Sequence, residues 1–294
     1  MFMDQPITPA RVEAVLGLLR SQLNKSAEIT WLKRLLQPEG LPGKSDRSDQ
    51  ARMAISACRD LHLVRQSDGI AELTIASGER RSTQVLLLEA LDTYVLGGKA
   101  VEPWFAMFYA FLIGRPPEQA HAGGGKAGDE WERLFNAEVF SNADVNNRFN
   151  KEKYKGFRRW LRYMGLGWHD SEDTFQPNPY DRMRRVLPTV FGEDSVIESD
   201  EFMQRLAEHC PELDGGAIFC EVNRDFDSAR RECTGALAAA LVEMNGDGII
   251  RLECPLDSHG WSLRRVVPAR TAVMPSDRFD RIHYLGHSTA PGQR

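Results

Sequence analysis

Apolar positions recur at helical spacing along most of the chain, and short alternating stretches separate them. The first segment opens with Thr8 and Pro9, a helix cap followed by proline in the first turn, and apolar residues then return every three or four positions. Two more helices are predicted over 29–36 and about 49–61. The next stretch, LHLVRQSDGIAELTI, reads as two short strands around a Ser-Asp-Gly turn. Three helices followed by a hairpin are typical of a winged helix-turn-helix, which we expect over residues 1–83.

The C-terminal third shows a similar order of elements. The predicted elements are helices over 200–209 and 226–244, a strand at GGAIFCEV, and a hairpin of strands over 249–254 and 261–267. The turn sequence NGDG ends the second of these helices. We therefore expect a second winged-helix-like unit over 196–284, followed by a disordered tail over 285–294.

Two further segments connect these end units. Residues 84–129 are predicted to form a helical connector that ends in the flexible sequence RPPEQAHAGGGKAGDE. Residues 130–195 are predicted to form a basic unit of helices, the last of which Pro188 should kink or end. The resulting fold class is mostly α with short β-hairpins (α+β), in which tandem winged helix-turn-helix-like units are joined by the helical connector.

Composition narrows the class of protein. The chain has 294 residues, of which 42% are hydrophobic and 27% charged, and its formal net charge is −5. No apolar run reaches the roughly 18 residues that span a membrane, and the N-terminus lacks the layout of a secretory signal, so we expect a cytoplasmic protein without a membrane partner. None of the five cysteines shows CxxC spacing, which favours buried thiols over disulfides or a zinc site.

The strongest candidate for chemistry is a cationic helix over 152–164. Between residues 148 and 163 there are seven positive residues and one negative residue, a net charge of +6 in an acidic chain. At 100° per residue Lys155, Arg158, Arg159 and Arg162 share one face, and an apolar stripe lies opposite them. The natural partner of such a face is a phosphate backbone. The alternative is a solvated face that forms ion pairs with the acidic stretch 192–201. The candidate DNA-binding residues here are Lys151, Lys155, Arg158, Arg159 and Arg162, with Arg184 and Arg185 following them.

The third helix of the first unit is a candidate recognition helix. Arg52, Ser56 and Arg59 share one face, and Arg47 precedes the helix. Winged helices also dock proteins, so DNA and protein remain alternative partners for this face. The corresponding segment of the last unit, TGALAAALVEM, exposes no Arg or Lys. We expect that segment to dock protein or to pack internally.

Motifs for catalysis are incomplete. HAGGGKAG lacks the spacing of a phosphate-binding loop, and Gly286-His287-Ser288 has no downstream His or Asp to complete a triad. Asp214 and Glu221 flank an apolar run as in some nucleases, but Asn223 stands where that arrangement needs lysine. We therefore predict no enzymatic activity, no metal and no cofactor.

Three stretches, NKEKYKGFRRWLRYMGLGW, PNPYDRMRRVLP and CTGALAAALVEMNGDGIIRLE, resemble the DpdG-type proteins. Those proteins are accessory components encoded with bacterial systems that insert 7-deazaguanine derivatives into DNA and restrict foreign DNA. The resemblance covers about residues 130–275 and implies a non-catalytic, DNA-associated subunit of an antiviral defence or modification cluster. Its expected partners are double-stranded DNA and proteins of the same operon, and a homodimer is left open. The alternatives are a winged-helix transcriptional regulator and a protein-docking scaffold that does not bind DNA.

Overall fold

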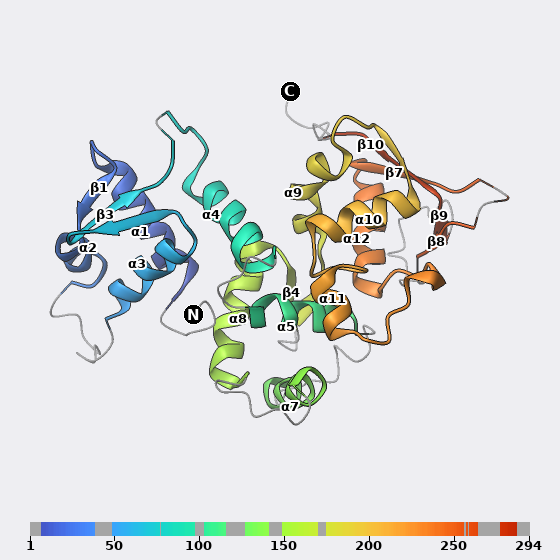
Figure 1. Ribbon diagram of the computed structural model, residues 1–294, viewed down its shortest axis with the longest axis horizontal. Helices are drawn as coiled ribbons and strands as arrows, with labels where there is room; N and C mark the ends of the chain where they lie inside the picture. Colours follow the sequence, from blue (N-terminus) through green and yellow to red (C-terminus); the bar gives the residue numbers. More distant parts are fainter. Residues whose placement is uncertain are drawn as a thin grey trace. The chain divides into compact units, whose positions relative to one another are not determined.

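The protein is a mixed α/β chain with small antiparallel sheets, seen here in a computed structural model (Figure 1). The described residues are 7–38, 49–76, 78–97, 103–115, 127–140, 149–169, 175–255, 257, 259–263 and 277–286. The chain divides into two compact units, each built from two segments. The first unit comprises residues 1–105 and 149–164, and the second comprises 106–148 and 165–294. The five-part division predicted from the sequence stays a prediction.

The first unit begins with three helices and three strands. In chain order these are α1 (Pro9–Ser21), β1 (Ser26–Glu28), α2 (Ile29–Leu36), α3 (Gln50–Asp60), β2 (Val64–Ser67) and β3 (Ile70–Leu73). The strands form one antiparallel sheet in the order β1-β3-β2. The Thr8 hydroxyl accepts a hydrogen bond from the Arg11 amide and caps α1, as the sequence predicts. The apolar stripes of α1 and α3 are buried and form the core.

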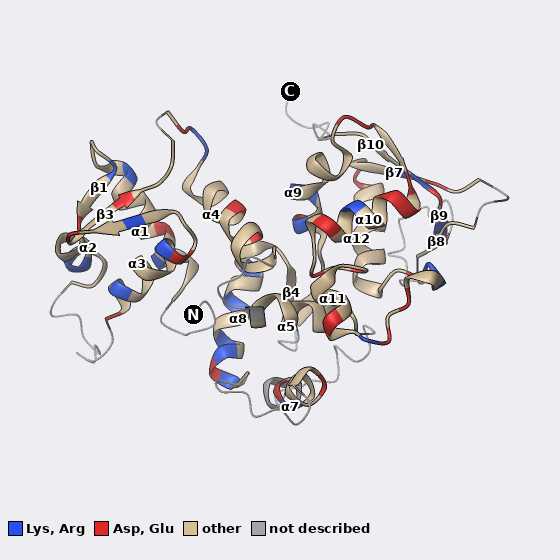
Figure 2. Cartoon of the chain, viewed as in Figure 1, with Lys and Arg blue, Asp and Glu red and all other residues tan. Residues whose placement is uncertain are grey.

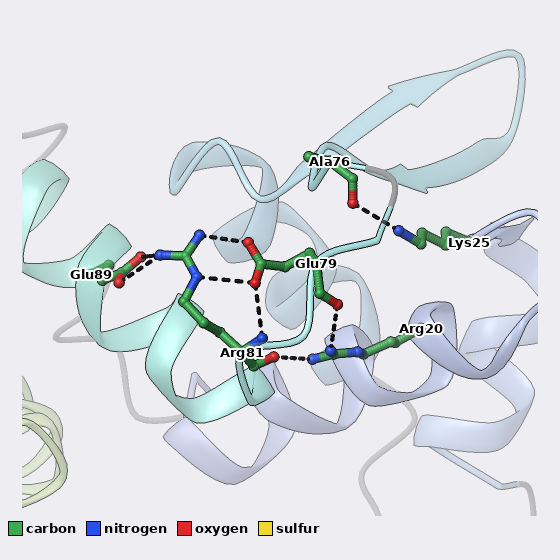
Figure 3. Close-up of polar contacts among 6 residues, drawn as sticks. All are labelled: Arg20, Lys25, Ala76, Glu79, Arg81 and Glu89. Carbon is green, nitrogen blue, oxygen red and sulfur yellow. Dashed lines mark hydrogen bonds and ion pairs between the residues drawn. The ribbon is translucent and has the colours of Figure 1, made fainter.

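Helix α4 (Thr83–Leu91), continued by a π-helical turn over Asp92–Leu96, is joined to α1 by polar contacts (Figure 3). The Arg20 guanidinium donates to the carbonyl oxygens of Arg81 at 2.5 Å and Glu79 at 3.0 Å. The Arg81 guanidinium in turn pairs with Glu79 at 2.6 Å and Glu89 at 2.5 Å. These contacts fix the segment before α4 against the end of α1.

The second unit contains most of the remaining elements. Its helices are α7 (Ala127–Phe140), α9 (Tyr180–Phe191), α10 (Ser199–His209), α11 (Ala217–Val222) and α12 (Gly235–Gly246), with a 3₁₀ turn at Ser228–Arg230. Its strands are β4 (Gly167–His169), β5 (Phe175–Pro177), β6 (Val196–Glu198), β7 (Ile250–Glu253), β8 (Trp261–Ser262), β9 (Arg278–Phe279) and β10 (Arg281–Tyr284). They form a three-stranded sheet, β6-β10-β7, and two pairs, β4-β5 and β8-β9. Helix α5 (Pro103–Ile113) enters this unit at Ala106 and is buried from there to its end.

Several predictions for this unit are wrong. The segment GGAIFCEV forms helix α11 and not a strand, because Phe219 and Val222 are buried at helical spacing. Helix α12 begins only at Gly235, where the Thr234 hydroxyl caps it. Helix α9 does not end at Pro188, one of the two predicted effects of this proline, but continues to Phe191, with the proline on its exposed side.

The predicted C-terminal hairpin is also wrong. Strand β7 pairs with β10, which lies about thirty residues further along the chain, and β8 pairs with β9. The remainder of the predicted strand 261–267, from residue 264 onward, lies outside the described residues. The same holds for most of the predicted flexible linker and for the tail from residue 287. In the part of the chain that the structure describes, every helix is too short or too polar to cross a bilayer.

Candidate nucleic-acid interface

Helix α8 (Lys151–Met164) separates its charged and apolar side chains as its sequence predicts. The side chains of Phe157, Trp160, Leu161 and Met164 are buried. The exposed positions include Lys151, Lys155, Arg159 and Arg162, and the half-buried Arg158 lies over the Tyr154 ring, with Cζ 5.8 Å from its centroid. Lys and Arg gather along this helix in Figure 2. One member of the predicted stretch differs: Lys153 is only 5% exposed and is part of the interior. We call Lys151, Lys155, Arg158, Arg159 and Arg162 the cationic stripe.

The apolar side of α8 anchors the stripe to the N-terminal part of the same unit. The Trp160 indole Nε1 donates to the Ile7 carbonyl oxygen at 3.3 Å. The Phe157 ring packs against the Phe105 ring, with the two ring centroids 4.7 Å apart. The Tyr163 hydroxyl donates to Glu13 Oε1 at 2.8 Å. Burial, and then this hydrogen bond, raise the pKa of Tyr163, so the phenol stays protonated as a donor. The cationic stripe therefore lies on a helix whose opposite side is packed against other residues of the first unit.

The carboxylate contacts differ between two members of the stripe, Lys155 and Arg162. Lys155 pairs with Glu152 at 3.0 Å, an exposed contact of the kind that contributes little to stability. Arg162, at the C-terminal end, has no carboxylate partner within the described ranges. An exposed row of cations on a fixed helix can bind a row of anions at helical spacing, and polyphosphate chains present such a row.

The exposed side of α3 provides a second cationic group in the same unit. The Arg52 side chain is 73% exposed and lies 3.7 Å from Asp49, and that of Arg59 is 52% exposed and pairs with Asp60 at 3.1 Å. Arg59 also donates to the Ser56 hydroxyl at 3.0 Å. Although burial alone would raise the pKa of Asp49, hydrogen bonds from Lys33 and the Arg52 amide lower it, so this carboxylate stays ionised.

A hollow of about 490 Å³ runs beside this face of α3. Arg52, Ser56, Arg59 and Lys33 supply most of its polar lining, and Ile7 and Ile55 supply part of its apolar lining. Ile7 is also the residue whose carbonyl binds Trp160, so the backbone at Ile7 links α8 to the hollow beside α3. This connection could not be predicted from the sequence, because Ile7 and Trp160 lie 153 residues apart.

The other predicted site residues belong to the second unit or fall outside the described residues. Arg184 is exposed and Arg185 half-buried on α9, in the second unit. Their neighbour Arg182 is buried and pairs with the fully buried Glu212 at 2.9 Å, so its charge is used in an interior ion pair. Arg47 lies outside the described residues.

Of the two carboxylates predicted as candidate nuclease ligands, Asp214 has a structural role, and Glu221 is exposed. Asp214 is buried and accepts hydrogen bonds from the Thr234 amide at 2.6 Å and the Thr234 hydroxyl at 2.8 Å. Asn223 donates to the Ala110 carbonyl at 3.0 Å. No group of three or more His, Cys, Asp or Glu within the described ranges could hold a metal ion. HAGGGKAG and the Gly286-His287-Ser288 motif fall wholly or mostly outside those ranges.

These features define a class: a mixed α/β protein with an anchored cationic helix. The family comparison is more specific. Residues 121–258, which include α8 and most of the second unit, match the family described as DpdG-like. The chain therefore resembles DpdG-type proteins over this range, as the sequence strings predicted, and the match suggests a role in a DpdG-type modification system. Comparisons with curated proteins and with solved structures gave no match.

Proposed function

We propose that the protein is a non-catalytic DNA-binding subunit of a DpdG-type modification or defence system. In this proposal the cationic stripe of α8 binds the phosphate backbone of double-stranded DNA. The observation that carries it is the outward position of the stripe on a helix held by Trp160. Each phosphate that is neutralised releases counterions, so binding should be only weakly dependent on base sequence and strongly dependent on salt.

The three-helix, three-stranded part of the first unit supports a second element of the proposal. Its order and its exposed Arg52 and Arg59 fit a winged helix-turn-helix whose third helix contacts a groove or phosphates. We propose that this part assists α8, that Arg184 and Arg185 of the second unit also bind DNA, and that other surfaces of the chain bind proteins encoded in the same operon.

Two charge-matched variants test the stripe. Arg159→Glu/Arg162→Glu reverses two exposed charges on α8, and Arg224→Glu/Arg230→Glu makes the same change in net charge at exposed positions of the second unit. Fluorescence anisotropy with a labelled DNA duplex, repeated over a series of salt concentrations, gives the affinity and the salt slope. Circular dichroism confirms that both variants are folded.

The proposal expects the α8 variant to bind at least about tenfold more weakly, with a shallower salt slope, and the control to stay within about twofold of the wild type. Equal loss in both variants would show that only the total charge matters. An unchanged midpoint in the α8 variant would refute the role of the stripe. Binding confined to one duplex sequence would instead favour a transcriptional regulator.

A further inference from the structure

Two three-stranded sheets in the part of the chain that the structure describes have the same order and the same register. In the first unit the central strand residue Ala71 pairs with Ala27 and Gln66. In the second unit Ile282 pairs in the same way with Ile197 and Leu252. The elements also follow in the same chain order, α1-β1-α2-α3-β2-β3 and α9-β6-α10-α12-β7-β10. The second unit therefore contains a six-element series that matches the first.

Backbone hydrogen bonds outside the helices and strands repeat at corresponding positions. The turn from third helix to strand is closed by Leu63 N to Cys58 O at 3.0 Å in the first series and by Ile249 N to Met244 O at 3.0 Å in the second. Two more bonds of the first series have counterparts in the second. The bond from Leu73 N to Lys25 O corresponds to that from Tyr284 N to Ser195 O. The bond from Ile29 N to Gly69 O corresponds to that from Ser199 N to Asp280 O. The turn between the third helix and the next strand also contains a residue in the left-handed conformation in each series, His62 at φ 56° and Gly248 at φ 69°. Such agreement sets a residue-by-residue correspondence.

The correspondence places different chemistry at the same positions of the third helix. Counted from the matched turn, Arg52, Ser56 and Arg59 of α3 correspond to Ala238, Val242 and Asn245 of α12. Ala238 is buried where Arg52 is 73% exposed. The Asn245 Oδ1 accepts a hydrogen bond from the Leu252 amide at 2.9 Å, so this side chain binds the backbone of β7. The exposed arginines of the first series therefore have no counterpart in the second.

The start of the third helix differs as well. In the first series 13 residues, 37–49, connect α2 to α3, and Asp49 at the helix start remains 38% exposed beside Lys33. In the second series the longer segment 210–234 carries α11 and brings the buried Asp214 onto Thr234 at the start of α12. A carboxylate therefore lies at the start of both helices: Asp49 accepts from the Arg52 amide at 2.8 Å and stays partly exposed, whereas Asp214 is fully buried. The start of α12 is thus covered from solvent, and the start of α3 is open to it.

We infer that the chain holds two copies of one structural unit, and that double-stranded DNA contacts the third helix of the first copy only. The inference rests on the proposed function, because it takes DNA as the partner. The interaction surface is the exposed side of α3, with Arg52 and Arg59 binding phosphates on either side of Ser56. Helix α12, with Ala238, Val242 and Asn245 at the corresponding positions and a covered start, takes no part in that contact.

Matched variants of equal net charge test this division. Arg52→Ala/Arg59→Ala removes two positive charges from α3, and Val242→Glu/Gly246→Glu adds two negative charges to α12. A Cβ at Gly246 meets no atom within 4 Å, so Gly246→Glu alone serves as a second α12 variant if the double variant is poorly folded. Affinity for a DNA duplex is measured by fluorescence anisotropy across salt concentrations on the full chain.

The inference expects the α3 variant to bind about tenfold more weakly, with a salt slope reduced by about 2, and both α12 variants to stay within about twofold of the wild type. Equal weakening by the α12 variants, or full affinity of the α3 variant, overturns it. The stripe variant Arg159→Glu/Arg162→Glu separates the two failures. If it weakens binding while the α3 variant does not, the proposed function stands and the assignment to α3 fails.

Discussion

Replacing Trp160 by alanine should destabilise the first unit, because this one side chain anchors α8. Trp160 is fully buried, and its indole nitrogen donates to the Ile7 carbonyl. A buried indole covers about 200 Å² of mostly apolar surface, which at about 25 cal/mol/Å² corresponds to about 5 kcal/mol. Measured losses for truncating buried tryptophan are about 3–5 kcal/mol, since the cavity partly relaxes. We therefore expect a loss of about 4 kcal/mol in the free energy of unfolding.

Urea unfolding followed by far-ultraviolet circular dichroism measures this change without relying on tryptophan fluorescence. The chain offers a matched control in Trp168 of β4, which is 53% exposed. Trp168→Ala should change the free energy of unfolding by less than about 0.5 kcal/mol. Trp160→Phe keeps an aromatic ring but loses the hydrogen bond, and should fall between the two.

The reasoning fails if Trp160→Ala costs less than about 1.5 kcal/mol, or no more than Trp168→Ala. Either result would mean that α8 does not depend on its packing beneath the indole. In that case the stripe would not be held on a fixed surface, and the proposed function would lose its structural support.

Two further predictions concern charged contacts. Arg182→Met should lower the free energy of unfolding by about 3–5 kcal/mol, since it leaves the Glu212 carboxylate buried without its ion pair. Adding Glu212→Met should restore much of the loss in urea titrations, and a double variant no more stable than the single one would contradict this explanation. Hydrogen bonds from Arg81, first from its guanidinium and then from its amide, lower the pKa of Glu79 to about 2 from the ordinary 4.5. The resulting stability is present above pH 4.5 and is lost as the pH falls towards 2, so Glu79→Gln should flatten the pH dependence of unfolding between these values; equal slopes in both proteins would argue against it.

Local patterns predicted the helices well, because helix formation depends on spacing and capping within a few residues. Thr8 and the apolar period of α1 are local signals, and the structure has both. The six-residue segment of α11 was misread, since a short apolar run fits a strand and a helix equally well. The partner of β7 was missed because strand pairing is non-local, and its true partner β10 follows a long intervening segment.

The candidate site shows the same division. The two faces of α8 could be read from the sequence, since a helix with that spacing must place its cations opposite its aromatic residues. Arg182 and Arg184 are alike in the sequence, yet one is buried against Glu212 and the other is exposed. Only the path of the rest of the chain could distinguish them.

By itself, then, the sequence determined the cationic stripe, most helices and the likeness to DpdG-type proteins. The tertiary structure decided that α8 belongs with the first unit, and that two matching sheets recur with different third helices. The physical reason is range: periodicity and capping act within one helix, whereas burial, ion pairing and strand register depend on residues brought together from distant parts of the chain.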